Sequence, residues 1–393
     1  MSRAGKQADV LVVGGGVVGA AAALALAQAG LAVTLVEGRE PAPWRADVPD
    51  LRVYALAPDN VALFQALGVW ESMRAARAYP YRQMRVWDAA GGDALAFDAD
   101  RLGRAQLGWI IENGLLVDRL WAELPLAGVQ VSCPAMVTEL EQEADGVRLR
   151  LSDGRKLEAR ILIAADGADS ALRTLAGIGV DRHDYGQRGV VAYIDSELPN
   201  QATAWQRFLP TGPLAVLPAG SHRSSSVWTL PDASAAAMLA LDEDAFNRAL
   251  TNAFGGHLGA LTLASKRAAF PLRRQLADRY LDGRLLLVGD AAHAVHPLAG
   301  QGVNLGLRDV AALRACVLDA KARRRDWASP ARLQRWAVAR QSEATVAAKG
   351  FSAINMLFSN DELHLSLARG PAMGLAGKLP PLVSLFWKHA SGG

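Results

Sequence analysis

The sequence predicts an α/β fold in which a Rossmann-like domain is interleaved with a mostly antiparallel sheet and followed by a helical C-terminal region. Three observations predict it. A glycine-rich turn separates two short apolar runs near the N-terminus, two later apolar runs end in polar turns, and residues 182–270 alternate strand-like stretches with turn residues. Strands separated by helices favour a parallel sheet, whereas closely spaced strands favour an antiparallel one.

Composition narrows the function classes. The chain has 393 residues, 51% of them hydrophobic and 21% charged, with a formal net charge of +3. It carries enough apolar material for about two to three packed domains. The weak positive balance argues against a nucleic-acid-binding protein, for which a basic stripe is typical. Cys133 and Cys316 make neither a disulfide framework nor a CxxC motif, which favours a reducing compartment such as the cytoplasm.

The first element is a predicted strand over Asp9–Val13, a short run of β-branched and apolar residues. The alanine- and leucine-rich stretch Val17–Ala29 predicts a helix, which Gly30 is placed to end. Leu31–Val36 predicts a second strand. The apolar segment from 10 to 27 also has the length of a membrane span, but its glycines and the second apolar run directly after it favour a strand–turn–helix–strand unit.

The turn between that strand and helix carries a GxGxxG pattern at Gly14, Gly16 and Gly19. Gly14 allows the tight turn, Gly16 lets the backbone approach a pyrophosphate, and Gly19 lets the helix pack closely on the strand. The helix N-terminus at Val17 presents free N–H groups and a positive dipole end to phosphates. The pattern predicts a dinucleotide site, without separating FAD from NAD.

Glu37 ends the second strand at roughly the 20-residue distance from the glycines that the fingerprint requires. A carboxylate there accepts hydrogen bonds from the adenosine ribose hydroxyls. It also disfavours a 2′-phosphate, which argues against NADP in this pocket.

The third and fourth predicted strands each run into a polar turn. Ile161–Ala165 leads to Asp166-Gly167, with Asp169 or Ser170 placed to cap a following helix. From the residues alone, this segment is equally a plain structural turn. Leu285–Val288 leads to Gly289-Asp290, at the strand end where α/β sheets bind ligands.

A glycine-rich stretch, residues 298–306, opens a predicted helix that extends to about Ala320. Just before it, His293 and His296 have a spacing that could suggest a metal site. No third histidine or carboxylate completes a metal-like pattern, and Pro297 disrupts a helix there. The sequence therefore predicts no metal.

These segments resemble, in this order, the FAD-dependent aromatic hydroxylases of the para-hydroxybenzoate-hydroxylase fold. The stretch from His296 to Asp309, HPLAGQGVNLGLRD, is similar to the signature of the ubiquinone-biosynthesis hydroxylases. The resemblance spans roughly residues 8–345. Its supporting segments are Asp50–Arg52 with Tyr54–Leu56, Leu107–Trp109 with Glu112-Asn113, Tyr185–Gln187, and Arg207–Pro213.

The resemblance implies a set of FAD contacts. Those for the ADP half are Gly14, Gly16, Val17, Gly19 and Glu37, with Arg52 reaching the pyrophosphate and Asp166 near the pyrophosphate and the nicotinamide route. Those for the flavin half are Asn113 on the flavin, Asp290 on the ribityl chain and Pro297 beside the isoalloxazine ring. Further along the chain, Gly302, Val303 and Asn304 are also implied as FAD contacts.

The resemblance also implies an electrostatic environment for the flavin. The backbone N–H groups of Gly300, Gln301 and Gly302, with the dipole of the helix that follows, would face the flavin N1–C2=O edge, where reduced flavin carries negative charge. Pro297 completes this flavin-edge environment. No residue pair is assigned as a catalytic acid or base.

The implied function is an FAD-dependent monooxygenase of ubiquinone biosynthesis. It would hydroxylate the aromatic ring of a polyprenylated phenol or quinone precursor with NAD(P)H and O2, through a C4a-hydroperoxyflavin. FAD would be bound without a covalent link, and NAD(P)H would bind only transiently. The alternatives are a soluble aromatic-compound hydroxylase, an isoprenoid flavin reductase, and a non-catalytic FAD-bearing subunit of a biosynthetic complex.

The predicted organisation is interleaved. The FAD-binding domain comprises residues 1–79, 106–181 and 273–340, the substrate domain comprises residues 182–272 with strands from 80–105, and residues 341–393 form the C-terminal helical region. On the substrate sheet, Trp205, Phe208, Leu217 and Trp228 are candidates either for lining the pocket or for plain core packing.

The last segment, residues 341–393, carries predicted helices over Ser342–Phe358 and Glu362–Ala368. An apolar cluster over Leu382–Trp387 is followed by Lys388 and His389. Such a cluster is typical of contact with a membrane surface, but it equally suits docking on the protein's own core or on another ubiquinone-biosynthesis protein. We expect a cytoplasmic protein, with peripheral contact at the inner face of the membrane as one option.

Overall fold

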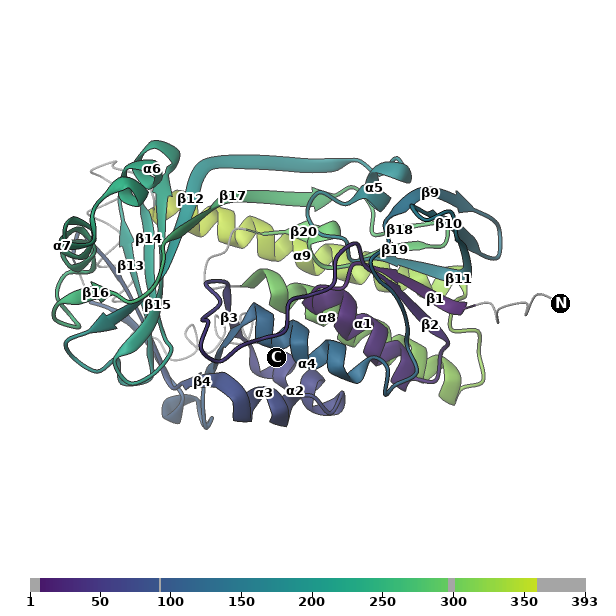
Figure 1. The fold of residues 1–393 in the computed structure, drawn as a ribbon, viewed down its shortest axis with the longest axis horizontal. Helices are drawn as coiled ribbons and strands as arrows, with labels where there is room; N and C mark the ends of the chain where they lie inside the picture. The colour runs from purple at the N-terminus through teal and green to yellow at the C-terminus, as the bar shows by residue number, and fades with distance from the viewer. Residues whose placement is uncertain (1–7, 92, 296–300, 359–393) are drawn as a thin grey trace.

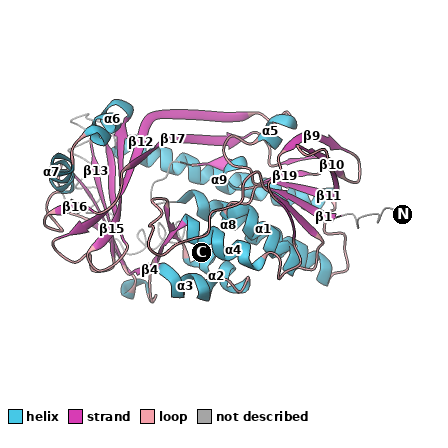
Figure 2. Cartoon of the chain, viewed as in Figure 1, coloured by secondary structure: helices cyan, strands magenta, loops and turns pink. Residues whose placement is uncertain are grey.

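The computed structural model describes residues 8–91, 93–295 and 301–358 (Figure 1). Strands gather at its two ends, and the helices α1 (Val17–Gln28), α4 (Asn113–Glu123) and α8 (Gln301–Ala322) lie between them (Figure 2). The predicted α/β class, with a Rossmann-like unit and a separate antiparallel sheet, is confirmed.

The first sheet is the Rossmann-like one. Its strands follow the order β18-β19-β11-β1-β2-β8, and β10 and β9 extend it from β11. Their bounds are β1 (Ala8–Val13), β2 (Val33–Val36), β8 (Gln130–Ser132), β9 (Val137–Gln142), β10 (Val147–Leu151), β11 (Lys156–Ala164), β18 (Leu281–Asp282) and β19 (Leu285–Leu287). The predicted strand–helix–strand unit at the N-terminus is confirmed, with Gly30 directly after the C-cap of α1 at φ +79°.

The helix α1 is buried almost all round, from Val17 to Leu26. It packs against α4 and α8 as well as β2. Its many alanines let the neighbouring helices come close, so the α1 residues join those of β1, β11 and β19 in the main hydrophobic core.

We call the first sheet with its helices the Rossmann lobe and the second large sheet with the helices packed on it the antiparallel lobe. A smaller sheet lies between these two lobes, with the order β3-β7-β4. Its strands are β3 (Val53–Leu56), β7 (Gly108–Glu112) and β4 (Ala78–Tyr81), and the helices α2 (Pro58–Ala66) and α3 (Trp70–Arg77) connect β3 to β4. The helix α4 begins directly after β7.

The second large sheet contains nine strands among the described residues, in the order β20-β17-β12-β15-β14-β13-β5-β6 with β16 on β12. All pairs are antiparallel except β5 with β13. The strands are β5 (Gln83–Asp88), β6 (Leu95–Asp98), β12 (Val180–Ser196), β13 (Thr203–Leu209), β14 (Gly212–Pro218), β15 (Arg223–Pro231), β16 (Leu261–Leu263), β17 (Ala268–Ala277) and β20 (His293–Ala294).

The two faces of this sheet have different partners, because side chains alternate along a strand. Trp205 and Trp228 pack under α6 (Asp232–Ala240) and α7 (Glu243–Phe254) in a closed core. Leu217 lies on the opposite face and packs toward the β3-β7-β4 sheet, and Phe208 packs with Val86. For the two tryptophans the core interpretation is therefore correct.

The remaining described elements are the helices α5 (Ala171–Leu175) and α9 (Pro330–Phe358) and the short 3-10 turns Asp100–Leu102 and Gly289–Ala291. The strands β12 and β17 run as a long ribbon between the two lobes (Figure 1). The predicted boundaries at 182, 272 and 341 fall inside β12, β17 and α9, since these elements continue past the positions where the composition changes.

Candidate functional site

Four neighbouring parallel strands end in one row. Val13 of β1 pairs with Val36 of β2 and with Ala164 of β11, and Ala164 pairs with Leu287 of β19. The segments directly after these strands therefore meet at one edge of the sheet: the glycine turn, Glu37, Asp166-Gly167 and Gly289-Asp290. Carboxyl ends of parallel strands are where α/β sheets bind ligands.

The glycine turn has the geometry that its sequence predicts. Gly14 has φ +104°, and a Cβ there would collide with the carbonyl oxygen of Ala165. A Cβ on Gly19 would collide with the carbonyl oxygen of Gly14, whereas one on Gly16 would meet no atom of the described chain within 4 Å. The tight turn predicted at Gly14 and the close packing predicted at Gly19 are confirmed, and open space faces Gly16.

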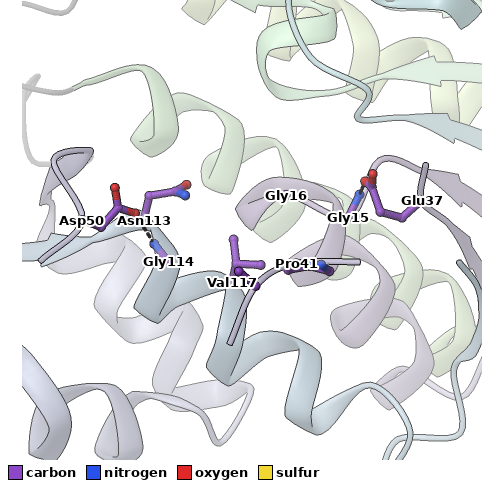
Figure 3. A pocket seen from close by; sticks show the side chains of 9 residues that line it. Gly15, Gly16, Glu37, Pro41, Asp50, Asn113, Gly114 and Val117 are labelled. Carbon is purple, nitrogen blue, oxygen red and sulfur yellow. Dashed lines mark hydrogen bonds between the residues drawn. The ribbon is translucent and has the colours of Figure 1, made fainter. Parts of the chain in front are cut away.

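A cavity of about 350 Å³ lies beside this turn (Figure 3). It is lined by Gly15, Gly16, Glu37, Pro41, Ala42, Asp50, Asn113, Gly114 and Val117. The first turn of α1, which opens at Val17, contains no acidic side chain, and its N-cap Gly16 offers no side-chain acceptor. The free N–H groups and the positive dipole end of α1 are thus available to an anion in the cavity.

Glu37 stands on the wall of this cavity. Its Oε2 accepts a hydrogen bond from the backbone N–H of Gly15 at 2.5 Å, and its Oε1 accepts one from Arg39 at 3.0 Å. On the other side of Gly15, the indole Nε1 of Trp121 in α4 donates to the Gly15 carbonyl at 2.7 Å. A Cβ on Gly15 would lie 2.5 Å from the Trp121 ring. Sequence reasoning missed both Gly15 and Trp121, since no spacing rule links α4 to the glycine turn.

At the far end of the cavity, Asn113 is the first residue of α4. Its Oδ1 accepts a hydrogen bond from the Tyr54 hydroxyl at 3.1 Å. The exposed guanidinium of Arg52 lies 5.6 Å from the centre of the Tyr54 ring. Burial raises the pKa of Tyr54 to about 12, and the nearby carboxylate of Asp290 adds to the shift. Tyr54 thus joins three predicted site residues, a role that its sequence position did not indicate.

Asp50 was not predicted as a site residue, although it begins one of the supporting segments. Its Oδ2 accepts from the Gly114 N–H at 2.8 Å and its Oδ1 from the Arg52 N–H at 2.9 Å. Its carboxylate therefore lies against the first turn of α4, where the helix dipole favours negative charge.

The Asp166 turn leaves one acceptor free. Oδ2 of Asp166 accepts from the Leu172 N–H at 3.1 Å, while Oδ1 is buried and has no hydrogen-bond partner in the part of the chain that the structure describes. Ser170 caps α5 by accepting a hydrogen bond from the Arg173 N–H at 3.0 Å. Of the two caps that the sequence allowed, Asp169 and Ser170, the second is therefore correct. The buried Arg173 guanidinium donates to the carbonyls of Ala168 and Ala291, at 2.8 and 2.9 Å, and ties the Asp166 turn to the Asp290 turn.

A buried charge cluster holds the Gly289-Asp290 turn. Asp309 of α8 accepts from the Gly289 N–H at 3.0 Å, from Nε2 of His293 at 2.6 Å and from Nε of Arg340 at 2.8 Å. Burial would raise the pKa of Asp309, but His293 and Arg340 hold it below its ordinary value. Burial would lower the pKa of His293, but Asp309 outweighs it and raises that pKa. His293 is therefore part of an internal ion pair.

The first turn of α8 carries Gly302, Val303 and Asn304. The buried Asn304 amide accepts from Ala57 N–H at 2.9 Å and donates to the Ala55 carbonyl at 2.8 Å, so its side chain fixes the junction of β3 and α2. Among the described residues, a Cβ on Gly302 would meet nothing within 4 Å. Pro297 and Gly300 lie outside the described residues, and of Gln301 only the backbone is described.

The geometry fits a dinucleotide with a pyrophosphate. An uncapped helix N-terminus, open space at Gly16 and a carboxylate at Glu37 lie at the cavity, and Asp166 follows the neighbouring strand β11 at the same edge of the sheet. Within residues 8–91, 93–295 and 301–358, no group of three or more His, Cys, Asp or Glu side chains could hold a metal ion. None of the described helices is long and apolar enough to cross a membrane.

Comparisons with known proteins agree with this geometry. Residues 7–348 match the family model of an FAD binding domain. The chain is 38% identical over 391 residues to the ubiquinone hydroxylase UbiL of Rhodospirillum rubrum, covering 99% of this chain and 90% of that one. It is 36% identical to the 3-demethoxyubiquinol 3-hydroxylase of Escherichia coli, covering 98% of each. The fold is similar to that of the p-nitrophenol 4-monooxygenase PnpA of Pseudomonas putida, with a TM-score of 0.79, 20% identity and 98% of each chain covered.

Proposed function

The chain belongs to the family of FAD-dependent ubiquinone-biosynthesis hydroxylases, and from that premise we propose that it hydroxylates the aromatic ring of a polyprenylated phenol or quinone precursor. It is an FAD-dependent monooxygenase, with NAD(P)H as the transient electron donor and O2 as the co-substrate. The observation that carries the proposal is the row of strand ends that gathers the glycine turn, Glu37, Asp166 and Asp290 at one edge.

The ADP half of FAD is proposed to lie in the cavity beside α1. Gly14, Gly16, Val17 and Gly19 would form its phosphate turn, and Glu37 would bind the adenosine ribose. The support is the uncapped N-terminus of α1, the open space at Gly16 and the position of Glu37 on the cavity wall. Arg52 would reach the pyrophosphate from the rim, where its side chain is exposed.

The flavin half is proposed to lie toward α8. Asp290 would hold the ribityl chain, Asn113 would contact the flavin, and the first turn of α8 at Gly302 and Val303 would face its N1–C2=O edge. The position of the Gly289-Asp290 turn, held against α8 by Asp309, supports this direction. Tyr54 also donates a hydrogen bond to Asn113, whose side chain lines the cavity. Asp166, whose Oδ1 has no hydrogen-bond partner among the described residues, would lie near the pyrophosphate.

FAD supplies the redox and oxygen-activating chemistry when it is bound. The chain itself would position the cofactor and the substrate, exclude water from the site and supply charge that stabilises the reduced flavin. The N–H groups and dipole of α8 stabilise negative charge at its N-terminus, and the Asp309 cluster keeps the Gly289-Asp290 turn in place. The face of the large sheet that carries Leu217 and Ala204 packs toward the β3-β7-β4 sheet in an apolar cluster. We propose that the hydrocarbon tail of the substrate binds beside this junction.

The substrate tail suggests where the protein works. A polyprenyl chain partitions into a bilayer, so we propose peripheral membrane contact, for which the apolar cluster over Leu382–Trp387 is the sequence candidate. That cluster lies outside the described residues.

The test uses the purified FAD-loaded protein. NAD(P)H added without oxygen should bleach the flavin absorbance. With isotopically labelled O2 and a short-chain polyprenyl phenol, one labelled oxygen atom should appear in the product. A flavin that NAD(P)H does not reduce would instead support the non-catalytic FAD-bearing subunit.

A further inference from the structure

The loop between β2 and β3 forms one wall of the cavity. We call residues 38–52 the cavity strap; they contain no helix or strand and supply Pro41, Ala42 and Asp50 to the lining. In Figure 1 the strap is the dark purple segment that runs from the end of β2 to β3. A segment without secondary structure needs side-chain contacts to keep one position.

Trp44 anchors the strap. Its indole Nε1 donates to Oε2 of Glu112 at 2.5 Å, and its backbone N–H donates to Asp118 at 3.0 Å. The guanidinium groups of Arg77 and Arg119 lie 5.2 and 5.8 Å from the centre of the indole ring. The ring is thus held between two cations and one carboxylate.

Glu112 is the acceptor on which the strap depends. It is only 2% exposed, and its Oε1 pairs with Nη1 of Arg77 at 3.0 Å. Arg77 also donates to the strap through the carbonyl of Ala46. A buried carboxylate is unfavourable unless charge and hydrogen bonds compensate it, so this group is fixed by donors from the strap and from α3.

A third donor comes from the large sheet. The hydroxyl of Tyr193 in β12 lies 3.3 Å from Oε1 of Glu112 and 3.2 Å from the carbonyl oxygen of Asp50 in the strap. Burial, together with Glu112, raises the pKa of Tyr193 above its ordinary value, so the hydroxyl remains a donor. Tyr193 is buried and lies on the face of β12 opposite to its core residues Val190 and Ile194.

These contacts join three parts of the molecule: the strap, the β7–α4 junction and the large sheet. We propose that Glu112 and Tyr193 are positioning residues for the cofactor, which hold the cavity strap against α4 and tie its position to the sheet proposed to bind substrate. This inference rests on the proposed placement of the ADP half of FAD in the cavity. Neither residue lines the cavity, so both act through Asp50 and Trp44.

The consequence is a measurable change in cofactor affinity. If the strap occupies its place only part of the time, the apparent dissociation constant equals the intrinsic constant divided by the fraction of time that the strap is in place. A merely structural residue would lower the stability of the apoprotein and the FAD-loaded protein equally. A positioning residue instead reduces the extra stability that FAD confers, because that gain depends on affinity.

The experiment titrates apoprotein with FAD and follows the quenching of flavin fluorescence. Tyr193→Phe keeps the ring and removes the hydroxyl, and we expect about tenfold weaker FAD binding, the effect of losing one hydrogen bond to a charged acceptor. Tyr280→Phe is the matched control, because the buried hydroxyl of Tyr280 has no hydrogen-bond partner within residues 8–91, 93–295 and 301–358. It should bind FAD as the wild type does. Wild-type affinity in Tyr193→Phe would overturn the proposal.

Trp44→Phe is the second variant and lies in the strap itself, so it does not disturb the sheets. It should also weaken FAD binding, and the FAD-induced rise in Tm should be smaller than in the wild type. Equal losses of Tm with and without FAD in both variants would overturn the positioning role. Glu37→Ala separates the failure of this inference from the failure of the proposed FAD placement. If Tyr193→Phe binds FAD normally and Glu37→Ala binds it weakly, only the inference fails. If Glu37→Ala also binds FAD normally, the placement of the ADP half fails, and the inference fails with it.

Discussion

At the scale of single residues, Glu37 has the clearest assignment. Its carboxylate already accepts hydrogen bonds from the N–H groups of Gly15 and Arg39, and it lines the cavity. It therefore stabilises the glycine turn, and we propose that it also accepts hydrogen bonds from the adenosine ribose of FAD. The sequence could predict this residue because its distance from the glycines follows from a local strand–helix–strand unit.

Glu37→Ala should weaken FAD binding more than it slows chemistry at saturating FAD. Hydrogen bonds to a charged acceptor contribute about 1.5–3 kcal/mol each before compensation, so at least about a tenfold rise in the dissociation constant is expected. Isothermal titration of the apoprotein with FAD measures it. Glu40→Ala, which removes an exposed carboxylate nearby, is the control. An unchanged constant in Glu37→Ala would show that Glu37 does not contact the ribose.

His293 predicts a pH dependence of stability. The pKa of His293 is raised in the folded protein above its ordinary value of 6.5. Its protonation therefore stabilises the fold fully below about pH 6.5, and this contribution is lost as the pH rises through the raised pKa. Urea unfolding of the FAD-loaded protein should show this decline in the wild type and not in His293→Gln. The same slope in both proteins would mean that the His293–Asp309 ion pair does not form.

At the scale of elements, hydrophobic pattern was a reliable guide where an element is buried. The unit β1–α1–β2 was predicted within two residues at its ends, because its strands and helix are almost wholly apolar. The first half of β12 was not predicted as a strand, because its residues are mostly exposed and polar. It is a strand because it pairs with β17. The start of α9 was placed too late, although Pro330 at its first position is a usual helix-start signal.

The first turn of α8 carries a prediction about the flavin. Gly302→Pro removes one N–H from that turn, and proline is tolerated there because the N–H has no partner within the helix. Loss of one preorganised donor to a developing anion costs about 2.7–4 kcal/mol in enzymes that use such donors. The midpoint potential of bound FAD should therefore fall, and flavin reduction by NAD(P)H should slow.

Gly302→Ala is the control for this variant, since it keeps the N–H and its Cβ would meet no atom of the described residues within 4 Å. Spectroelectrochemistry on the folded, FAD-loaded variants measures the potential. A wild-type potential in Gly302→Pro would mean that this turn does not face the flavin.

At the scale of the whole molecule, the site is assembled from distant segments. The four strand ends could be anticipated to meet, because parallel strands bring their carboxyl ends to one edge. The contacts of Trp44, Glu112 and Tyr193 could not, since they join a loop, a strand end and a second sheet whose relative positions no local pattern encodes. The contacts of Tyr54 and Trp121 could not be predicted from the sequence for the same reason.

FAD should be held by this assembly without a covalent link. The contacts proposed for it are hydrogen bonds, a helix dipole and packing, and no side chain is assigned as an attachment point. Acid precipitation should release all the yellow colour into the supernatant. Colour retained in the washed protein pellet would contradict this.

The central claim is ring hydroxylation of a polyprenylated quinone precursor, and the quinone lipids of the cell test it most directly. The measurement is mass spectrometry of lipid extracts from the organism that encodes the chain, with its gene deleted and then restored. The account predicts that the deletion accumulates a polyprenylated precursor lacking one ring oxygen, and that the restored gene removes it. A quinone profile identical to that of the parent strain would contradict the account.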